Sequence, residues 1–247
     1  MRKLRDVFYV NADFENNCFT CYELLFSEFI QYCPDSIDNI LLLDPMIRPH
    51  PVNQHLFMTT LNRDAINEMS KQDVYEYGDF LWMDYRDEES LNRCTEQEKA
   101  EILYLSKYWV PLKSPFFNSI GNRYVYLAHD DGWLCKLYCR DKTAFIEFLA
   151  NKITGFFATN KRRKLYPIGE EIKTRLLEWA GEGLLIDFRN AVKRGSYQLS
   201  FSVIGKFIDM DEMYHTVDSM KNVARKGGWM EMSSKRWKME CWDRQLK

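Results

Sequence analysis

Two apolar-rich segments flanking an Asp-Gly pair constrain the fold more than any other feature of the sequence. Residues 123–129 and 133–140 are rich in strand-forming residues, and Asp130-Asp131-Gly132 lies between them. Asp131-Gly132 tolerates the positive φ angles of a two-residue hairpin turn. With the turn there, one face of the pair carries Tyr124, Tyr126, Ala128, Cys135, Leu137 and Cys139. Both faces are largely apolar, so we expect an interior strand pair that helices cover on at least one side.

Local signals predict the elements around this hairpin. Thr95 with Glu98 forms a capping box, which predicts a helix up to about Trp109 with Ile102, Leu103 and Leu105 buried. Apolar spacing predicts further helices at 21–30, 54–72, 143–157, 170–180, 184–194 and 209–224. Strands are predicted at 6–10, 40–43, 80–85 and 196–203, and a strand pair at 229–242. The predicted fold class is α+β: a mixed or antiparallel sheet around the 123–140 hairpin, covered by helices, with a smaller α+β C-terminal unit.

The charge distribution suggests two regions. Residues 1–150 carry 15 Lys and Arg against 24 Asp and Glu, whereas residues 151–247 carry 19 against 12, although the whole chain has a net charge of −2. The basic run 161–164 lies near the change of sign and is the best linker candidate. We expect an acidic α+β domain at 1–160 and a basic α+β subdomain at 161–247, or the same two regions packed as one domain.

Cysteine usage and hydropathy predict the compartment. The chain has seven cysteines, an odd number, which favours free thiols in a reducing compartment. The longest aliphatic run, Ile40 to Leu43, is far shorter than a membrane span. We therefore expect a soluble cytoplasmic protein that does not bind a membrane. No glycine-rich phosphate loop or dinucleotide fingerprint occurs in the sequence, so no cofactor is expected.

Two groups of residues are candidates for chemistry. His129, Asp130 and Asp131 could hold a divalent ion or orient a water, as in a metal-assisted hydrolase or nuclease-like enzyme; a solvated hairpin turn explains the same residues. Cys18 and Cys21, together with His50 and His55, have the local spacings of a zinc site. However, 28 residues separate the two pairs, so a core cysteine pair and two loop histidines are the alternative.

Two segments are candidate binding surfaces. The acidic-aromatic segment 79–89 contributes Trp82, Asp84, Tyr85 and Asp87, and a solvated turn is the alternative interpretation. The C-terminal third mixes cations with aromatic rings, with the candidate residues Arg225, Lys226, Trp229, Arg236, Trp237 and Lys238. These residues suit a protein partner, and together with 161–164 and the rest of 225–244 they also suit single-stranded nucleic acid. A terminal hairpin with core tryptophans and solvated cations is the structural alternative.

The leading functional hypothesis is a non-catalytic cytoplasmic binding protein of the inhibitor or immunity type, acting through protein–protein interaction. A hydrolase using His129, Asp130 and Asp131 is the second hypothesis, and a nucleic-acid-binding protein is the third. The sequence leaves the oligomeric state open.

Overall fold

A single antiparallel sheet organises the molecule. A computed structural model of the chain describes residues 7–43, 52–53, 56, 58–71, 80–129, 134–158, 165–192, 197–207, 210–218, 224, 226–233 and 235–243. Within these ranges twelve strands form one sheet in the order β12-β11-β10-β9-β1-β2-β8-β7-β6-β3-β5-β4. Every neighbouring pair is antiparallel. The strands are β1 (Val7–Asp13), β2 (Cys18–Tyr22), β3 (Asn39–Leu42), β4 (Val52–Asn53), β5 (Met58–Asn62), β6 (Phe80–Asp84), β7 (Tyr124–His129), β8 (Leu134–Cys139), β9 (Leu184–Val192), β10 (Tyr197–Val203), β11 (Lys226–Ser233) and β12 (Arg236–Asp243).

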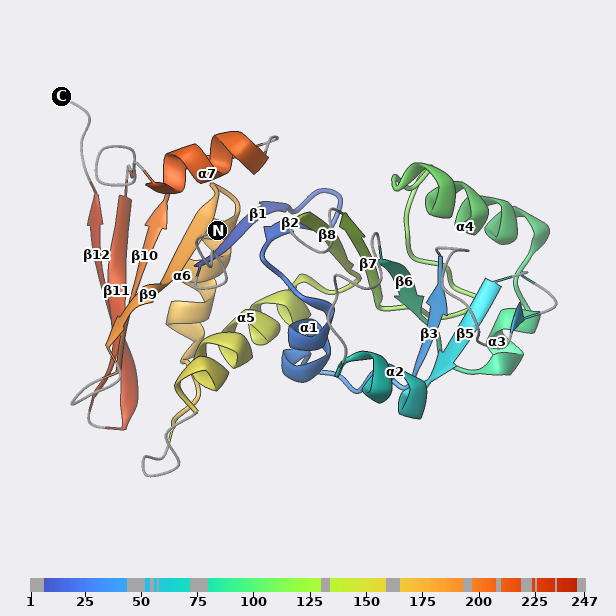
Figure 1. Cartoon of the computed structure of the whole chain (residues 1–247), viewed down its shortest axis with the longest axis horizontal. Coiled ribbons are helices and arrows are strands. Elements are labelled where there is room, and N and C mark those ends of the chain that lie inside the picture. The colour runs from blue at the N-terminus through green and yellow to red at the C-terminus, as the bar shows by residue number, and fades with distance from the viewer. Residues whose placement is uncertain are drawn as a thin grey trace.

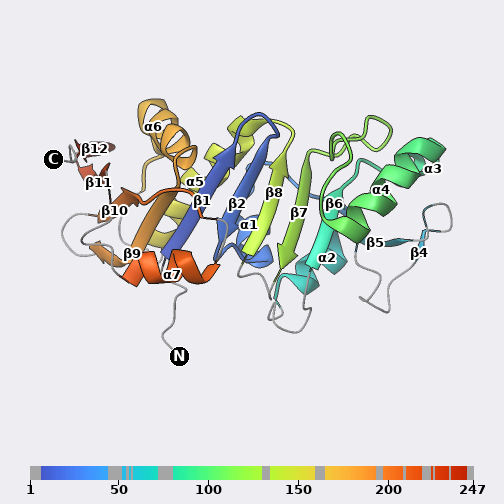
Figure 2. The ribbon, with the colours of Figure 1, turned by 90° about the horizontal axis from the view of Figure 1, so that it is seen from above.

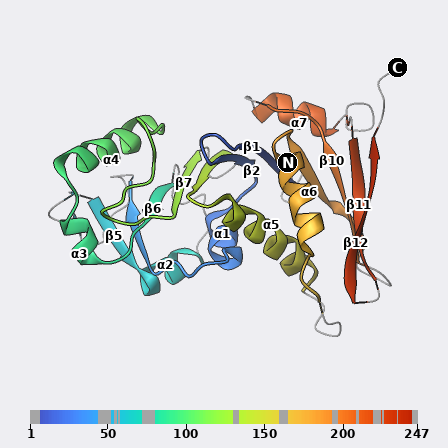
Figure 3. The same ribbon diagram turned by 180° about the vertical axis from the view of Figure 1, so that it is seen from behind.

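Helices lie on both faces of this sheet (Figures 1 and 3). We call the first face the one covered by α1 (Phe26–Tyr32), α2 (Arg63–Met69), α5 (Lys142–Phe157) and α6 (Glu170–Ala180). The second face carries α3 (Glu88–Asn92) and α4 (Glu96–Tyr108) at one end and α7 (Met210–Asp218) at the other. No helix in the described ranges is both long enough and apolar enough to cross a membrane.

The first face holds the main hydrophobic core. Inward side chains of most strands pack there against Phe29 of α1, Phe148 of α5 and Trp179 of α6. Each of these rings is buried, and burying an aromatic side chain of this size is one of the larger favourable contributions to folding. This continuous core extends from β5 to β12.

The second face is different because its apolar residues form two separate clusters. One cluster packs β3, β6, β7 and β8 against α3, α4 and the segment after α4, with Ile102 and Leu105 at its centre. The other packs β1, β2 and β9 against α7 through Tyr9 and Met213. Seen from above, parts of the strands β1, β2 and β8 lie between α7 and α4 (Figure 2).

The predicted α+β class is confirmed, and the sheet is antiparallel throughout. The predicted hairpin is present as β7 and β8, and its register pairs His129 with Leu134, as a turn centred on 131–132 requires; the turn itself lies outside the described residues. The helix at 143–157 is confirmed as α5. The capping box of Thr95 and Glu98 starts α4, but Leu103 is exposed, so its predicted burial is wrong.

Three of the predicted helices are wrong in whole or in part. Residues 184–192 form strand β9 between β1 and β10. Within 54–72, strand β5 occupies Met58–Asn62, and the helix α2 begins only at Arg63. The helix begins there because Asn62 caps it by accepting a hydrogen bond from the backbone N–H of Ala65. Within 21–30, Cys21 belongs to β2, and α1 begins only at Phe26.

The two regions that differ in charge contribute to the same sheet. β1 pairs with β9 through four residues of each strand, and Lys173 of α6 forms an ion pair with Glu147 of α5. The candidate linker 161–164 lies outside the described residues.

Candidate binding groove

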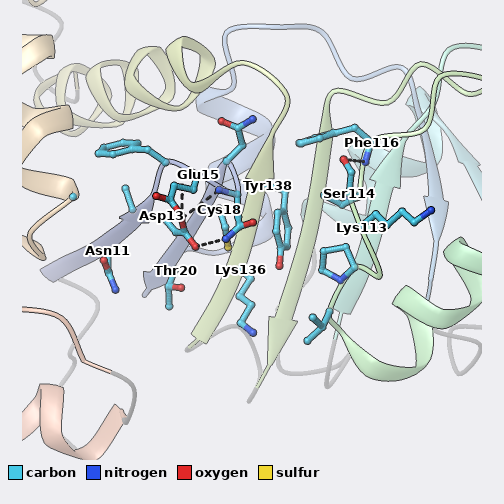
Figure 4. Close-up of a pocket in the computed structure, with 18 of the residues that line it drawn as sticks. Asn11, Asp13, Glu15, Cys18, Thr20, Lys113, Ser114, Phe116, Lys136 and Tyr138 are labelled. Atoms are coloured by element: carbon cyan, nitrogen blue, oxygen red, sulfur yellow. Dashed lines mark hydrogen bonds between the residues drawn. The ribbon is translucent and has the colours of Figure 1, made fainter.

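A large open groove occupies the uncovered middle of the second face (Figure 4). Its volume is about 1180 Å³, and we call it the central groove. Its lining residues are Asn11, Ala12, Asp13, Phe14, Glu15, Asn16, Asn17, Cys18, Thr20, Val110, Pro111, Leu112, Lys113, Ser114, Pro115, Phe116, Lys136, Tyr138, Gly181 and Lys206.

The floor of the central groove is a polar strip across three strands. Asn11 of β1 lies opposite Thr20 of β2, which lies opposite Lys136 of β8. These side chains alternate with core residues along each strand, so they point to the second face. All three are partly exposed, since neither α4 nor α7 reaches them. The strip therefore separates the two apolar clusters of this face.

One wall is the segment that follows α4. Trp109 ends the helix in the left-handed conformation, with φ of 57°, and the chain then turns along the groove. Farther on, the buried amide of Asn122 holds this wall: its Oδ1 accepts from the backbone N–H of Phe117 at 2.8 Å, and its Nδ2 donates to the Pro115 carbonyl at 2.9 Å. Arg140 also donates through Nε to the Asn122 carbonyl at 2.8 Å. The wall is thus anchored to the residue that directly follows β8.

The opposite wall includes Lys206, whose loop is fixed by a buried tyrosine. The Tyr9 hydroxyl donates to the Gly205 carbonyl at 2.7 Å and accepts from the backbone N–H of Phe207 at 3.2 Å. Gly183 also contacts this loop, and the backbone N–H of Ile204 donates to its carbonyl at 3.0 Å. Both walls therefore rest on buried hydrogen bonds.

The shifted pKa values in the central groove all move away from neutrality. Burial raises the pKa of the Cys18 thiol to about 11, although a hydrogen bond to Tyr138 lowers it in part. Burial also raises the pKa of Tyr138. The hydrogen bond from the Asn16 side chain lowers the pKa of Asp13. General acid–base or nucleophilic catalysis needs shifts in the opposite direction, toward the working pH.

Cations outnumber anions around the central groove. Lys113 lies on one wall, Lys136 on the floor and Lys206 on the other wall, whereas the carboxylates are those of Asp13 and Glu15. None of the three lysines lies within salt-bridge distance of a carboxylate of the described residues, although the charge of Lys206 contributes to lowering the pKa of Asp13. Asp13, by contrast, accepts hydrogen bonds from Asn16 and from the backbone N–H of Glu15.

Exposed apolar side chains are concentrated beside the central groove. Seven large hydrophobic residues are exposed in the described part of the chain, and four of them lie between residues 103 and 112. They are Leu103, Tyr108, Val110 and Leu112. Phe14 is a fifth, at the turn between β1 and β2, and also lines the groove. Several exposed apolar side chains beside a groove are a feature of interaction sites.

The acidic-aromatic candidates lie mostly in the interior. Trp82 is fully buried in β6, and Asp84 and Tyr85 are also buried. Asp87 is exposed and caps α3 by accepting from the backbone N–H of Ser90 at 2.7 Å. Both faces of β6 are covered, so this segment presents little aromatic surface.

The two cysteines of the candidate zinc site lie on opposite faces of the sheet. Cys18 belongs to the cluster on the second face and Cys21 to the core on the first face, so the two thiols point to opposite sides of β2. His50, His55, Asp130 and Asp131 lie outside the described residues, and His129 is described only as the last residue of β7. Among the described residues, no group of three or more His, Cys, Asp or Glu side chains could hold a metal ion.

The C-terminal candidates divide between surface and core. Trp229 of β11 and Arg236 and Lys238 of β12 are exposed, while Lys226 forms an ion pair with Glu182. Trp237 is buried, and its Nε1 donates to the Tyr166 carbonyl at 2.7 Å. Arg225 lies outside the described residues.

Sequence reasoning missed the central groove. Its floor residues come from three strands that are distant in the chain, and no local pattern marks them. The run Tyr108 to Lys113 contained a usable signal, because apolar residues continue past the end of a capped helix and up to a proline.

No protein-family model matches the chain. No curated protein and no solved structure matches it.

Proposed function

We propose that this is a non-catalytic cytoplasmic binding protein that holds a protein partner in the central groove, as an inhibitor or immunity-type protein does. The observation that carries the proposal is the exposure of Val110 and Leu112 on one wall of the central groove, with Leu103 and Tyr108 exposed on α4, the helix that precedes this wall. Burial of exposed apolar side chains is the main favourable contribution to most protein–protein association.

The charges of the central groove favour a protein over a nucleic acid. Lys113, Lys136 and Lys206 suit carboxylates of a protein partner, and Asp13 and Glu15 suit its cations, whereas a phosphate backbone carries negative charge alone. The pKa values of Cys18, Tyr138 and Asp13 are shifted away from neutrality, which is not the direction that acid–base catalysis uses. All seven cysteines are free, which supports a reducing compartment such as the cytoplasm.

The test is an affinity capture from native lysate with quantitative mass spectrometry. The groove variant combines Val110→Asp with Leu112→Asp. The matched control is Val192→Asp on β9, because Val192 is 40% exposed and lies outside the central groove. All three side chains are exposed, so the melting temperatures should stay close to that of the wild type.

Proteins captured by the wild type and by Val192→Asp should be lost with the groove variant. With a purified partner, the groove variant should bind at least about tenfold more weakly. The proposal is wrong if the groove variant captures the same proteins, or if no protein is captured specifically. Retention of the wild type on single-stranded DNA that is lost with the groove variant would instead support the nucleic-acid hypothesis.

A further inference from the structure

The outer edge of β12 is the long open edge of the sheet. β12 is the last strand in the sheet order and pairs with β11 along all eight of its residues. No other strand of the described chain pairs with it (Figure 1). The free N–H and C=O groups of an edge strand are a template for another strand. The opposite edge is formed by β4, which has only two residues.

The charges along β12 are ordered by sign. Arg236 and Lys238 occupy its first half, and Glu240 and Asp243 occupy its second half. All four residues are exposed. Charged residues on an edge usually prevent strand pairing. Here, however, an antiparallel copy of the same strand places the basic half of each strand beside the acidic half of the other.

We propose that β12 pairs with β12 of a second copy of this chain, antiparallel, around a two-fold axis at Met239. Lys238 of each copy then lies opposite Glu240 of the other, so the charge pair forms twice. Arg236 lies opposite Trp242, an arrangement that suits a cation–π contact. The interface is isologous, as in most homodimers, and it joins the two sheets into one.

The charges select this register over its neighbours. Residues opposite each other in an antiparallel pair point to the same face of the sheet. The two-fold axis of a symmetric pair therefore passes through a residue rather than between two residues, and the neighbouring registers move the axis by one residue. Centring the pair on Lys238 places this cation opposite itself. Centring it on Glu240 places two carboxylates opposite each other. Of these three registers, only the one centred on Met239 opposes no like charges.

The apolar side chains of β12 fit the same register. Trp237, Met239 and Cys241 alternate with the charged residues and face α6, where Met239 and Trp237 adjoin the main core. Met239 is partly exposed and Cys241 is exposed. In the dimer the two Met239 side chains meet at the axis, so the apolar strip of one copy continues into the other.

The first test measures mass against protein concentration by analytical ultracentrifugation. The wild type should show a monomer–dimer equilibrium. Lys238→Glu and Glu240→Lys should each raise the dimer dissociation constant by at least about tenfold, because each replaces two attractive pairs with two repulsive ones. The double variant with both substitutions has the wild-type net charge and should restore dimerisation. A wild type that is monomeric throughout, or a double variant that remains monomeric, overturns the proposal.

The second test locates the axis by disulfide formation. Met239→Cys in a Cys241→Ser background should give a covalent dimer on mild oxidation, because residue 239 faces its own copy across the axis. The wild type is the matched control, because its Cys241 lies four residues out of register with Cys241 of the second copy, about 13 Å along the strand. Cross-linking of the wild type at the same rate as the variant, or no cross-linking of the variant, contradicts the register.

This inference is independent of the proposed function. The central groove is formed by β1, β2, β8 and the segment after α4, and none of its lining residues lies on β11 or β12. Val110→Asp with Leu112→Asp should therefore leave the dimer intact, and Lys238→Glu should leave partner capture intact. Failure of one proposal is thus distinguishable from failure of the other.

Discussion

Replacing Asp84 with alanine should destabilise the fold without acting on a binding surface. Asp84 ends β6, and its side chain is 5% exposed. Its Oδ1 accepts from the backbone N–H groups of Arg123 and Tyr124, each at 2.7 Å, and its Oδ2 accepts from Arg123 Nε at 3.1 Å. The carboxylate therefore satisfies the backbone where β7 begins beside β6.

The expected cost of Asp84→Ala is about 2 to 5 kcal/mol of unfolding free energy. Each backbone N–H left without an acceptor costs about 1 to 3 kcal/mol, and the value for Arg123 falls at the low end because that region is only partly buried. The ion pair adds at most about 1 kcal/mol, because Arg123 is 42% exposed. Asp84→Asn keeps an oxygen for both N–H groups, so it should cost less than half as much as Asp84→Ala.

The pH dependence provides a second readout. Burial raises the pKa of Asp84, although the hydrogen bonds from Tyr124 and Arg123 oppose this shift. The folded state therefore binds the proton more tightly than the unfolded chain does. The resulting stabilisation is fully present below the unfolded pKa of about 3.9 and is lost as the pH rises through the folded pKa. The stability of the wild type relative to Asp84→Asn should therefore increase as the pH falls.

Urea unfolding followed by tryptophan fluorescence, at about pH 4 and about pH 7, measures both quantities. The matched control is Asp38→Ala, because Asp38 pairs with Arg63 where both side chains are more than half exposed, and its loss should cost less than about 1 kcal/mol. This prediction is wrong if Asp84→Ala is as mild as the control. It is also wrong if this variant retains full stability and loses a binding partner, since Asp84 would then act as a contact residue.

Two further predictions concern backbone space and a buried charge. Gly183→Ala should lower the free energy of unfolding in urea by at least about 3 kcal/mol, because Gly183 has φ of 92° and a Cβ there would lie 1.8 Å from the Gly205 carbonyl oxygen. The control is Gly169→Ala, where a Cβ would have no atom within 4 Å, and it should cost less than about 1 kcal/mol. Glu28→Gln should cost about 2 to 4 kcal/mol, because it leaves the buried ammonium of Lys152 without the carboxylate that lies 2.7 Å away. Lys152→Met should be milder, because a thioether packs well beside the Phe8 and Phe188 rings that now face the cation; thermal unfolding in which Lys152→Met is the more harmful would contradict this.

Local sequence signals predicted those elements that local interactions determine. The Thr95–Glu98 capping box places the start of α4, since both partners lie within one turn. The β7–β8 hairpin follows from its turn and from the two apolar faces beside it. By contrast, the apolar spacing of β9 resembles that of a helix. This segment is a strand because it pairs with β1 and β10, and β1 lies nearly 180 residues away in the chain.

The burial of a side chain could not be predicted from the sequence where it depends on packing against distant elements. Trp82 and Asp84 belong to an acidic-aromatic run, but β6 lies between β3 and β7 and has cores on both faces, so these side chains are interior. Leu103 fits the helical spacing of α4, yet α4 packs on the sheet through Ile102 and Leu105, and this direction leaves Leu103 in solvent. Tertiary placement, which a single-sequence pattern does not contain, decides both cases.

The central groove follows from the way the second face is covered. Two short helical elements, α4 and α7, lie at opposite ends of this face and bury one apolar cluster each. Strands between them have no helix to pack against, so apolar side chains there would remain in water. Asn11, Thr20 and Lys136 occupy these positions instead, each on a strand whose other face belongs to the main core. Solvation therefore explains Thr20 and Lys136 on the floor, whereas Asn11 Oδ1 is buried without a hydrogen-bond partner in the described part of the chain. Solvation does not explain Val110 and Leu112, which are exposed on the wall although polar residues would serve equally well. Their exposure is the part of this region that folding does not require, and for that reason the binding proposal is tested at these two residues.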